Sequence, residues 1–431
     1  MFPNPQDALP LPARPNLEQY RKLAQDLVNA CTSGDRPAIG AWADRWIASL
    51  LAASNRQSRD RAANQVEEFA IRAMTAGKRT CVLADAQFVI ARAHGFESWP
   101  KFSAHLDVLT RAGGGGGAPF EAAAQAIVDG DEETLRRLLR EQPDLIRARS
   151  EREHNATLLH YVSANGVEGY RQNTPQNIVR ITEILLEAGA EVEAEANVYG
   201  GGCTTLGLVA TSAHPRQAGV QNPLIQLLLD HGAEIEHPNL AGNDHGAVFA
   251  CLANGCPEAA RYLADRGARL DLVSAAGVGR LDVVQSRFDR ASVPELEMAM
   301  RYAAAYGHGN VVTCMLDRGV EVDAHTGDGE TALFYAVLSG HLDVIRLLLA
   351  RGARPGVRTR WGGDIVGAAL WRAGHGGDPD LYVKLIDVLV AAGGALPDRH
   401  PPVNGIVDDA LARRGSLADA GRYWWGEEPR R

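Results

Sequence analysis

The fold is decided by residues 331–353, which read TALFYAVLSGHLDVIRLLLARGA. The stretch holds two apolar runs of short helical length, separated by Ser339, Gly340 and His341. The Thr331 hydroxyl group can cap the first helix, and Gly352 can take the left-handed conformation that ends the second. Small apolar residues let two antiparallel helices approach each other closely. The stretch therefore predicts a helix-turn-helix unit.

This stretch resembles the ankyrin-repeat consensus, in which TPLHxAA is followed by GH and then by VVxLLLxxGA. The family implies an all-α solenoid, because one pair of helices exposes too much apolar surface to stand alone and neighbouring pairs must stack. Weaker copies of the motif align on its turn glycine. They predict eight units over about residues 119–398, aligned at Gly130, Gly166, Ala213, Gly255, Gly279, Gly307, Gly340 and Gly374.

Upstream of the repeats, residues 17–111 are expected to form a helical module of four or five amphipathic helices, because apolar residues recur there at helical spacing. Within it, residues 83–106, LADAQFVIARAHGFESWPKFSAHL, resemble a helical segment of bacterial ankyrin proteins of unassigned role. Five consecutive glycines, Gly113–Gly117, cannot hold a helix and predict a linker over residues 112–118. Residues 1–16 are expected to be an extended proline-rich N-terminus, and residues 399–431 a C-terminal tail.

Composition limits the classes of partner. The 431 residues carry 44 basic and 53 acidic side chains, a net charge of −9, which lacks the basic excess of a phosphate-binding surface. Nucleic acid is therefore not expected as a partner. Because no run of about 18 apolar residues and no signal-peptide core are present, no membrane partner is expected and a cytoplasmic location is predicted.

The cysteines are scattered along the chain without a CxxC pair, which favours free thiols in a reducing compartment over a disulfide framework. Cys251 and Cys256 lie near His245, but a closed zinc site needs four ligands at tetrahedral spacing. No metal and no cofactor are therefore expected. The six cysteines are Cys31, Cys81, Cys203, Cys251, Cys256 and Cys314.

Two adjacent units carry insertions in the turn between their helices. In a regular unit the turn residue lies 12 positions before the terminal glycine, as from Gly340 to Gly352. The same interval is 23 positions from Gly166 to Gly189 and 19 positions from Ala213 to Gly232. The insertions read VEGYRQNTPQN (167–177) and PRQAGVQ (215–221), and are expected to lie side by side on one edge of the solenoid. Together with the loop NVYGGGCTT (197–205), they would gather the hydrogen-bonding residues Asn165, Glu168, Tyr170, Arg171, Tyr199, Thr205, His214 and Gln221.

Other candidate binding residues follow from the resemblance. The variable position after TPLH faces the concave groove of ankyrin folds, and here it carries Tyr161, Tyr302 and Tyr335, although these rings could instead fill gaps between repeats. His245 is expected at a fingertip, as a binding residue or in a solvated turn. By contrast, consensus histidines hydrogen-bond between repeats, which the resemblance implies for His160, His308, His341 and His375.

Two functions remain open from the sequence. The leading hypothesis is a binding protein that presents a concave ankyrin surface to a partner protein. The alternative is an enzyme or small-molecule binder that uses a polar pocket formed by the two insertions. No P-loop, GxSxG or HExxH motif is present, so no catalytic residue is assigned.

Overall fold

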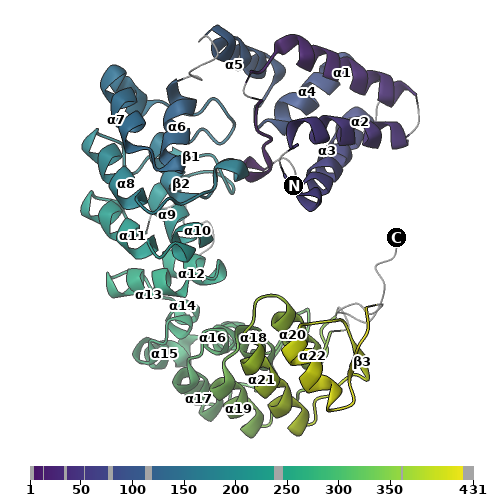
Figure 1. Ribbon diagram of the computed structural model, residues 1–431. Helices are drawn as coiled ribbons and strands as arrows, with labels where there is room; N and C mark the ends of the chain where they lie inside the picture. Colours follow the sequence, from purple (N-terminus) through teal and green to yellow (C-terminus); the bar gives the residue numbers. More distant parts are fainter. Residues whose placement is uncertain are drawn as a thin grey trace. The chain divides into compact units, whose positions relative to one another are not determined.

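A computed structural model describes residues 4–12, 14–33, 36–52, 54–75, 81–111, 119–236, 246–360 and 363–420 (Figure 1). Within them the regular structure is almost entirely helical, as predicted. The described strands form two short pairs, with β1 (Glu195–Ala196) antiparallel to β2 (Cys203–Thr204) and β3 (Arg399–His400) parallel to β4 (Leu417–Ala418). The chain divides into two compact units, unit 1 (1–243 and 254–259) and unit 2 (244–253 and 260–431).

Unit 1 begins with a bundle of helices within residues 17–111. A short 3₁₀ helix, η1 (Pro5–Asp7), precedes them. The aromatic rings of Trp42, Phe96 and Phe102 are buried in the bundle core, where the His94 ring stacks on Phe102. The bundle helices are α1 (Leu17–Thr32), α2 (Arg36–Leu50), α3 (Arg56–Thr75), α4 (Leu83–Ala93) and α5 (Trp99–Arg111) (Figure 1).

Cys31 and Cys81 form a disulfide in this bundle, with their Cα atoms 6.1 Å apart. The expectation of free thiols is therefore wrong for this pair, whereas the other four cysteines are free. The two residues are 50 positions apart in the sequence, and that spacing carries no information about distance in space. They meet because α1, which contains Cys31, packs against α4, which begins just after Cys81.

The rest of unit 1 consists mainly of stacked helix pairs. The first helix of the second pair is a 3₁₀ helix, η3, which ends at Ala164, a residue with a left-handed backbone (φ 47°). The predicted glycine linker lies outside the described residues, so the boundary between bundle and repeats stays a prediction. The pairs are α6 (Pro119–Asp129) with α7 (Glu132–Glu141), η3 (Leu158–Ser163) with α8 (Ile178–Glu187), and α9 (Thr205–Ala210) with α11 (Gln221–Asp230); η2 (Pro143–Arg147), η4 (Gly169–Arg171) and α10 (Ala213–Gln217) lie between them.

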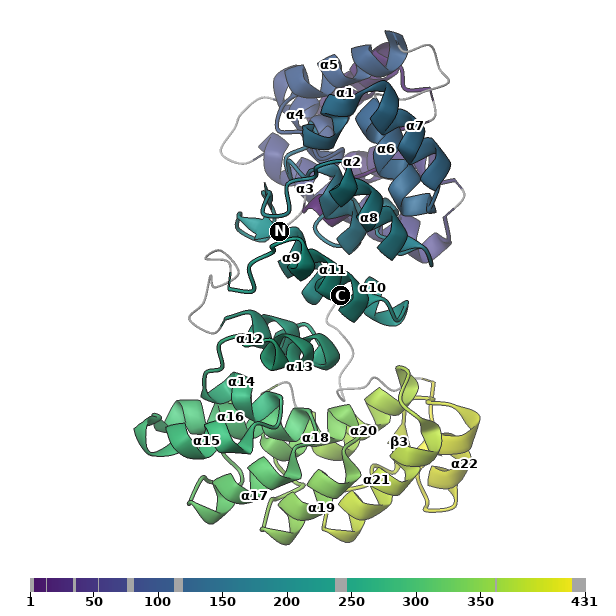
Figure 2. The ribbon, with the colours of Figure 1, turned by 90° about the vertical axis from the view of Figure 1, so that its left-hand side faces the viewer.

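Unit 2 holds a row of helix pairs that begins at α12 (Gly246–Ala253), while α13 (Pro257–Asp265) begins in one unit and ends in the other. Figure 2 shows α14, α16, α18 and α20 in one row and α15, α17, α19 and α21 in a second row. The pairs are α14 (Leu272–Gly277) with α15 (Leu281–Arg287), α16 (Val293–Ala305) with α17 (Gly309–Asp317), α18 (Ala332–Ser339) with α19 (Leu342–Ala350), and α20 (Ile365–Gly374) with α21 (Pro379–Ala391); η5 (Phe288–Arg290) follows α15.

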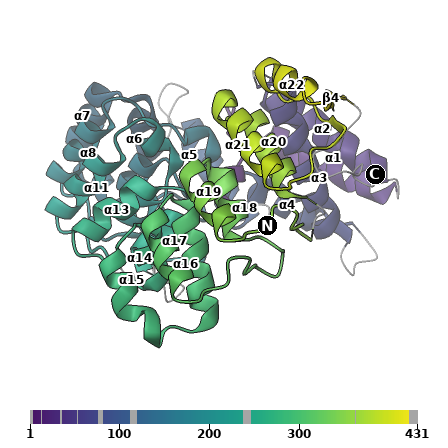
Figure 3. The ribbon, with the colours of Figure 1, turned by 90° about the horizontal axis from the view of Figure 1, so that it is seen from below.

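The segment predicted as a C-terminal tail contains a further helix. This helix, α22 (Gly405–Ala412), packs on α21 and buries Val407, Ala410 and Leu411 (Figure 3). Asn404 caps it by accepting a hydrogen bond from the backbone N–H of Val407 at 3.1 Å. Residues 405–412 therefore cover the last apolar face of the row.

Histidine rings join successive pairs in three places, as the resemblance implied. Nε2 of His308 hydrogen-bonds the Gly277 carbonyl group at 3.0 Å, and Nε2 of His341 does the same with Ala305 at 3.0 Å. His160 makes a longer contact of 3.3 Å with the Cys203 carbonyl oxygen. Nδ1 of His375 bonds to the Trp371 carbonyl group of its own helix.

Two of these histidine rings each pack against a turn glycine. A Cβ atom on Gly279 would lie 2.6 Å from Nδ1 of His308, and one on Gly307 would lie 2.8 Å from Nδ1 of His341. At the next junction Tyr382 takes over this role, since its hydroxyl group donates to the Val337 and Leu338 carbonyl groups at 3.0 Å. Gly279 and Gly307 are therefore needed for two reasons: the backbone has a positive φ, and the histidine ring occupies the space that a Cβ atom would take.

Replacing Gly307 by alanine should destabilise unit 2 more than the same change at Gly319. Both residues have a left-handed backbone, with φ of 81° and 90°, so each variant should lose about 1–2 kcal/mol through strain. Only Gly307 also faces a ring, whereas a Cβ atom on Gly319 meets nothing within 4 Å. Urea unfolding followed by circular dichroism measures both losses, and equal losses would contradict the proposed packing role.

Candidate functional site

The first insertion is folded back into unit 1. Asn173 Nδ2 donates to the Val128 carbonyl group and Asn177 Nδ2 to that of Gly130, both at 2.9 Å. These two carbonyl groups belong to the end of α6 and the turn that follows it. The insertion is thus tied to the preceding helix pair, and the Glu168 side chain is fully buried.

Three buried charged side chains, Arg152, Glu168 and Arg171, and the half-buried Glu121 of α6 form what we call the ion network. Nη1 of Arg152 lies 2.7 Å from Oε1 of Glu121 and 3.0 Å from Oε1 of Glu168. Nη1 of Arg171 lies 2.7 Å from Oε2 of Glu121 and 3.2 Å from Oε1 of Glu168. Each arginine therefore contacts both glutamates, and the two positive charges balance the two negative ones.

This pairing controls the protonation states in the ion network. Burial alone would raise the pKa of the Glu168 carboxyl group, but Arg152, His154 and Arg171 together outweigh burial and hold that pKa well below its usual range. The Glu121 pKa is lowered in the same way by Arg152 and Arg171, against the effect of burial. Burial alone would lower the pKa of Arg152, but the negative charges of Glu168 and Glu121 raise it by more, so the Arg152 pKa is raised. All four groups are thus charged near neutral pH.

Aromatic rings enclose the ion network. The Arg171 guanidinium group lies 5.9 Å from the ring centre of Tyr161 and 5.5 Å from that of Tyr170. Nη2 of Arg152 donates to the Tyr170 hydroxyl oxygen at 3.1 Å, and the Tyr161 hydroxyl group donates to Oε1 of Glu168 at 3.4 Å. Tyr161 is fully buried, so the expectation that it faces a concave groove is wrong. The short η3 helix leaves its ring inside, where Phe120 covers it.

The ion network also contacts the N-terminal bundle. The Arg152 guanidinium group lies 5.4 Å from the ring centre of Phe96, which belongs to the bundle core. The backbone N–H of Glu153 donates to the Gly95 carbonyl group at 2.8 Å, and the Glu153 carboxylate pairs with Arg92. The segment around Arg152 therefore joins the bundle to the first helix pairs within unit 1.

Sequence reasoning missed Glu121, Arg152 and His154, whose Nε2 lies 3.7 Å from Oε1 of Glu168. One signal was present, since Glu121, Ala124 and Val128 follow each other at helical spacing and share a face of α6. A glutamate on an otherwise apolar face needs a partner inside the protein. For Arg152 and His154 the sequence contains no comparable local signal, because they precede η3 in an irregular segment.

The loop 197–205 is held against the turn of the preceding pair. The Tyr199 hydroxyl group donates to Oδ1 of Asn165 at 2.7 Å, and Asn165 Nδ2 donates to the Leu208 carbonyl group at 3.3 Å. Tyr199 has a left-handed backbone (φ 52°), and 61% of its surface is exposed. Thr205 is fully buried at the start of α9. Asn165 and Tyr199 are thus brought together as predicted, whereas Thr205 is inside.

The second insertion does not join the first. Gln221 is buried, and its Nε2 donates to the carbonyl groups of Val209, Ala210 and Ser212 at 3.0–3.1 Å, so it closes the end of α9. His214 lies exposed on α10. Across the described residues, no hydrogen bond or ion pair links the two insertions. Three residues of the expected patch, Glu168, Arg171 and Gln221, are buried.

Unit 2 carries a set of half-buried rings on its first helices, which we call the aromatic row: Phe249, Tyr302, Tyr306 and Tyr335. The Tyr302 ring centre lies 5.3 Å from that of Phe249 and 6.3 Å from that of Tyr306. The Tyr335 hydroxyl group, one helix further along, donates to Oε2 of Glu330 at 2.7 Å. Tyr302 and Tyr335 thus lie on first helices, as the repeat pattern predicted.

Two further features bear on ligands. His245 lies outside the described residues, as do the residues directly around it. In the part of the chain that the structure describes, no group of three or more His, Cys, Asp or Glu side chains is arranged to hold a metal ion. None of the helices in that part is long and apolar enough to cross a membrane.

Comparison with known proteins agrees with the helix pairs of unit 2. The family model described as "Ankyrin repeats (3 copies)" matches residues 272–359, which contain α14 to α19 and the loops between them. A search of curated proteins found no match. The matched segment contains the glycine–histidine junctions of Gly279 and Gly307. Residues 272–359 of this chain are therefore ankyrin repeats.

Proposed function

We propose that this protein is a protein-binding module that presents the aromatic row of unit 2 to a partner protein. Ankyrin repeats generally mediate protein binding, and the observation that carries the proposal is the set of partly exposed rings on α12, at the end of α16 and on α18. Aromatic side chains supply large contact areas at low cost in conformational entropy, which makes them frequent anchors in interfaces.

The rings of the aromatic row are already held in place. The Tyr306 hydroxyl group bonds to the Leu252 carbonyl group, and Tyr335 bonds to Glu330. Tyr302 packs between the rings of Phe249 and Tyr306. Because these side chains keep little rotational freedom, a partner that covers them loses little entropy in ordering them.

We also propose that the helix pairs outside residues 272–359 are ankyrin repeats, eight units in all over residues 119–398. Their support is the shared capping chemistry. Thr204 accepts a hydrogen bond from the N–H of Gly207 at 3.4 Å, as Thr331 accepts one from Phe334 at 3.3 Å. Gly189 and Gly232 both have φ of 92°, close to the 91° of Gly352. The bundle would then cap the first of these repeats.

The alternative function, a polar pocket in the insertions, has less support. The ion network neutralises its own charges, and Tyr161 and Tyr170 cover it. A site for a charged ligand would need an uncompensated charge or an open face. We therefore assign the first insertion a role in joining parts of unit 1.

Replacing Tyr302 and Tyr335 together by alanine should weaken partner binding at least about tenfold, because anchors of this kind each contribute more than 1 kcal/mol. The partner is first isolated by co-purification with the full chain and identified by mass spectrometry, and its dissociation constant is then measured by calorimetry. Tyr262→Ala is the matched control, since this half-buried tyrosine lies on the second helix α13. Unchanged affinity in the double variant would refute the proposed surface.

A further inference from the structure

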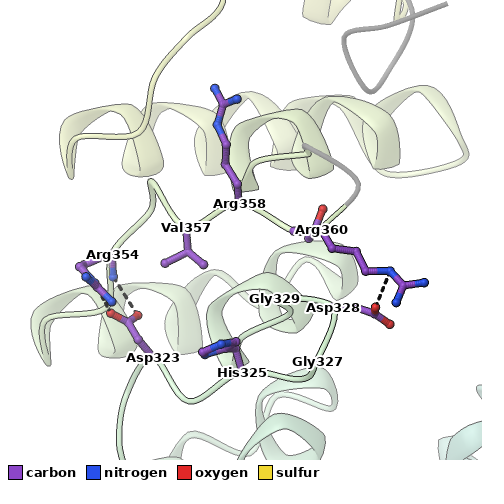
Figure 4. A pocket seen from close by; sticks show the side chains of 10 residues that line it. Asp323, His325, Gly327, Asp328, Gly329, Arg354, Val357, Arg358 and Arg360 are labelled. Atoms are coloured by element: carbon purple, nitrogen blue, oxygen red, sulfur yellow. Dashed lines mark hydrogen bonds and ion pairs between the residues drawn. The ribbon is translucent and has the colours of Figure 1, made fainter.

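A pocket of about 320 Å³ lies between the finger loops that precede α18 and α20 (Figure 4). Its two lining aspartates are already paired with arginines at 2.7 Å, as Asp323 is with Arg354. Arg358 extends out of the space, on the opposite side of its loop from Val357 (Figure 4). No free guanidinium group among these described lining residues therefore faces the pocket.

A free positive charge lies instead on a first helix, at Arg301. This partly buried residue belongs to α16 and directly precedes Tyr302 of the aromatic row. It makes no hydrogen bond and no ion pair with any residue that the structure describes. Glu297 lies one turn earlier on α16, and Glu330 accepts from the Tyr335 hydroxyl group, but neither carboxylate is paired with Arg301. The Arg301 guanidinium group is therefore left without an acceptor.

The Arg301 guanidinium group presents one edge to solvent. Of its three nitrogens, only Nη1 is buried without an acceptor. Nε and Nη2 also lack an acceptor among the described residues, so they are in contact with solvent. These two atoms direct N–H groups in parallel from one edge of the planar group, and a carboxylate can accept both at once. Because a partly buried charge is less well hydrated than an exposed one, it gains more from such an acceptor.

The Arg301 charge lies close to two rings of the aromatic row. Burial raises the pKa of Tyr302 and of Tyr335, and in both cases the positive charge of Arg301 acts against that shift. The two tyrosines occupy equivalent positions in adjacent repeats, each five residues before its turn glycine, Gly307 or Gly340. Their helices, α16 and α18, pack against each other. A segment that covers both rings therefore passes Arg301.

We propose that the partner segment on the aromatic row carries an aspartate or glutamate whose carboxylate accepts hydrogen bonds from Nε and Nη2 of Arg301, next to an apolar side chain that covers the rings. The inference rests on the proposed function, because it takes the ligand to be the protein segment bound on the row. A carboxylate fits this site better than a phosphate group, since the nearby Glu297 and Glu330 repel a doubly charged ligand more strongly. The pair would give the bound segment a fixed direction and register.

The test uses the full chain and a phage-displayed library of random peptides. Enriched peptides should share an acidic position next to an apolar one, and a fluorescein-labelled synthetic copy should bind by fluorescence polarisation. Arg301→Met should weaken that binding at least about tenfold, because two charge-assisted hydrogen bonds are lost. Changing the acidic residue of the peptide to its amide should cost a similar factor. Both changes together should cost little more than either one, because the two groups act as a pair.

Arg346→Met is the matched control, since this exposed arginine lies on the second helix α19, and it should leave the affinity for the peptide unchanged. Melting curves separate binding from a structural role. Because Arg301 has no partner within the described protein, Arg301→Met should not lower the melting temperature. Four results would overturn the proposal: no enrichment above the naive library, no shared acidic position, independent losses that add in the combined change, or a lower melting temperature for Arg301→Met.

The two proposals fail separately. If the Tyr302 and Tyr335 double variant loses its native partner while Arg301→Met binds the peptide as tightly as the unchanged protein, only the carboxylate contact is refuted. If the double variant keeps its native partner while Arg301→Met loses the peptide, the rings are refuted as anchors and the carboxylate contact at Arg301 stands.

Discussion

Replacing Arg152 by methionine should lower the free energy of unfolding of unit 1 by about 3–5 kcal/mol, the usual cost of removing one partner from a buried ion pair. The Arg152 side chain is almost fully buried and contacts both Glu121 and Glu168. Without it, two carboxylates remain inside with only Arg171 to balance them. Calorimetry and urea unfolding followed by circular dichroism measure the loss.

Arg180→Met is the matched control for this variant. Arg180 also contacts two glutamates, Glu183 and Glu187, but Arg180 and Glu187 are exposed and Glu183 is only partly buried on α8, so melting should not change measurably. Adding Glu168→Leu to Arg152→Met should recover part of the stability, because the unbalanced carboxylate is then absent. A small effect of Arg152→Met alone, equal to that of Arg180→Met, would show that the ion network does not hold unit 1 together.

The second large effect is a loss of stability in acid. The pKa values of Glu121 and Glu168 are lowered in the folded protein, so their contribution is complete above the unfolded value of about 4.5. It is lost as the pH falls below 4.5 toward the folded pKa values. Each unit of pKa difference corresponds to about 1.4 kcal/mol. The melting temperature should therefore fall steeply below pH 4.5.

Two buried histidines add a separate loss of stability, which begins at a higher pH. Burial lowers the pKa of His94 to about 3 and that of His160 to about 4, against an unfolded value of 6.5. Their contribution is therefore complete above pH 6.5 and declines as the pH falls below it. The double variant Glu121→Gln and Glu168→Gln isolates the carboxylates, because it keeps both histidines. Its melting temperature should decline less between pH 4.5 and 3 than that of the unchanged protein, and parallel curves would contradict the prediction.

The helix pairs could be predicted because their signals are local. The cap at Thr331, the turn at Gly340 and the end at Gly352 lie within one stretch of sequence, and the apolar positions between them repeat at helical spacing. Each signal acts through the backbone of its own few residues, so neighbouring repeats do not change it. The helices of the bundle were predictable for the same reason.

The ion network could not be predicted because its contacts are distant in sequence. Arg152 and Glu121 are 31 residues apart, and Arg171 reaches the Glu121 carbonyl group over 50 residues. From the sequence, Glu168 and Arg171 could only be assigned to an insertion that gathers hydrogen-bonding residues, without their partners. Burial of a charge depends on an opposite charge in space, which a spacing rule does not detect.

The glycine–histidine junctions have a consequence for how such a chain can grow. Each junction joins a turn glycine to the histidine of the next repeat, as Gly307 is joined to His341. A tandem duplication of residues 308–340 would place a second His308 directly after Gly340, so every new junction would again pair glycine with histidine. The final turn would still meet Tyr382. Gene duplication could therefore lengthen the array in steps of this segment, because each new junction repeats an existing contact. A duplication that began or ended inside the ion network would instead separate charged side chains from their partners.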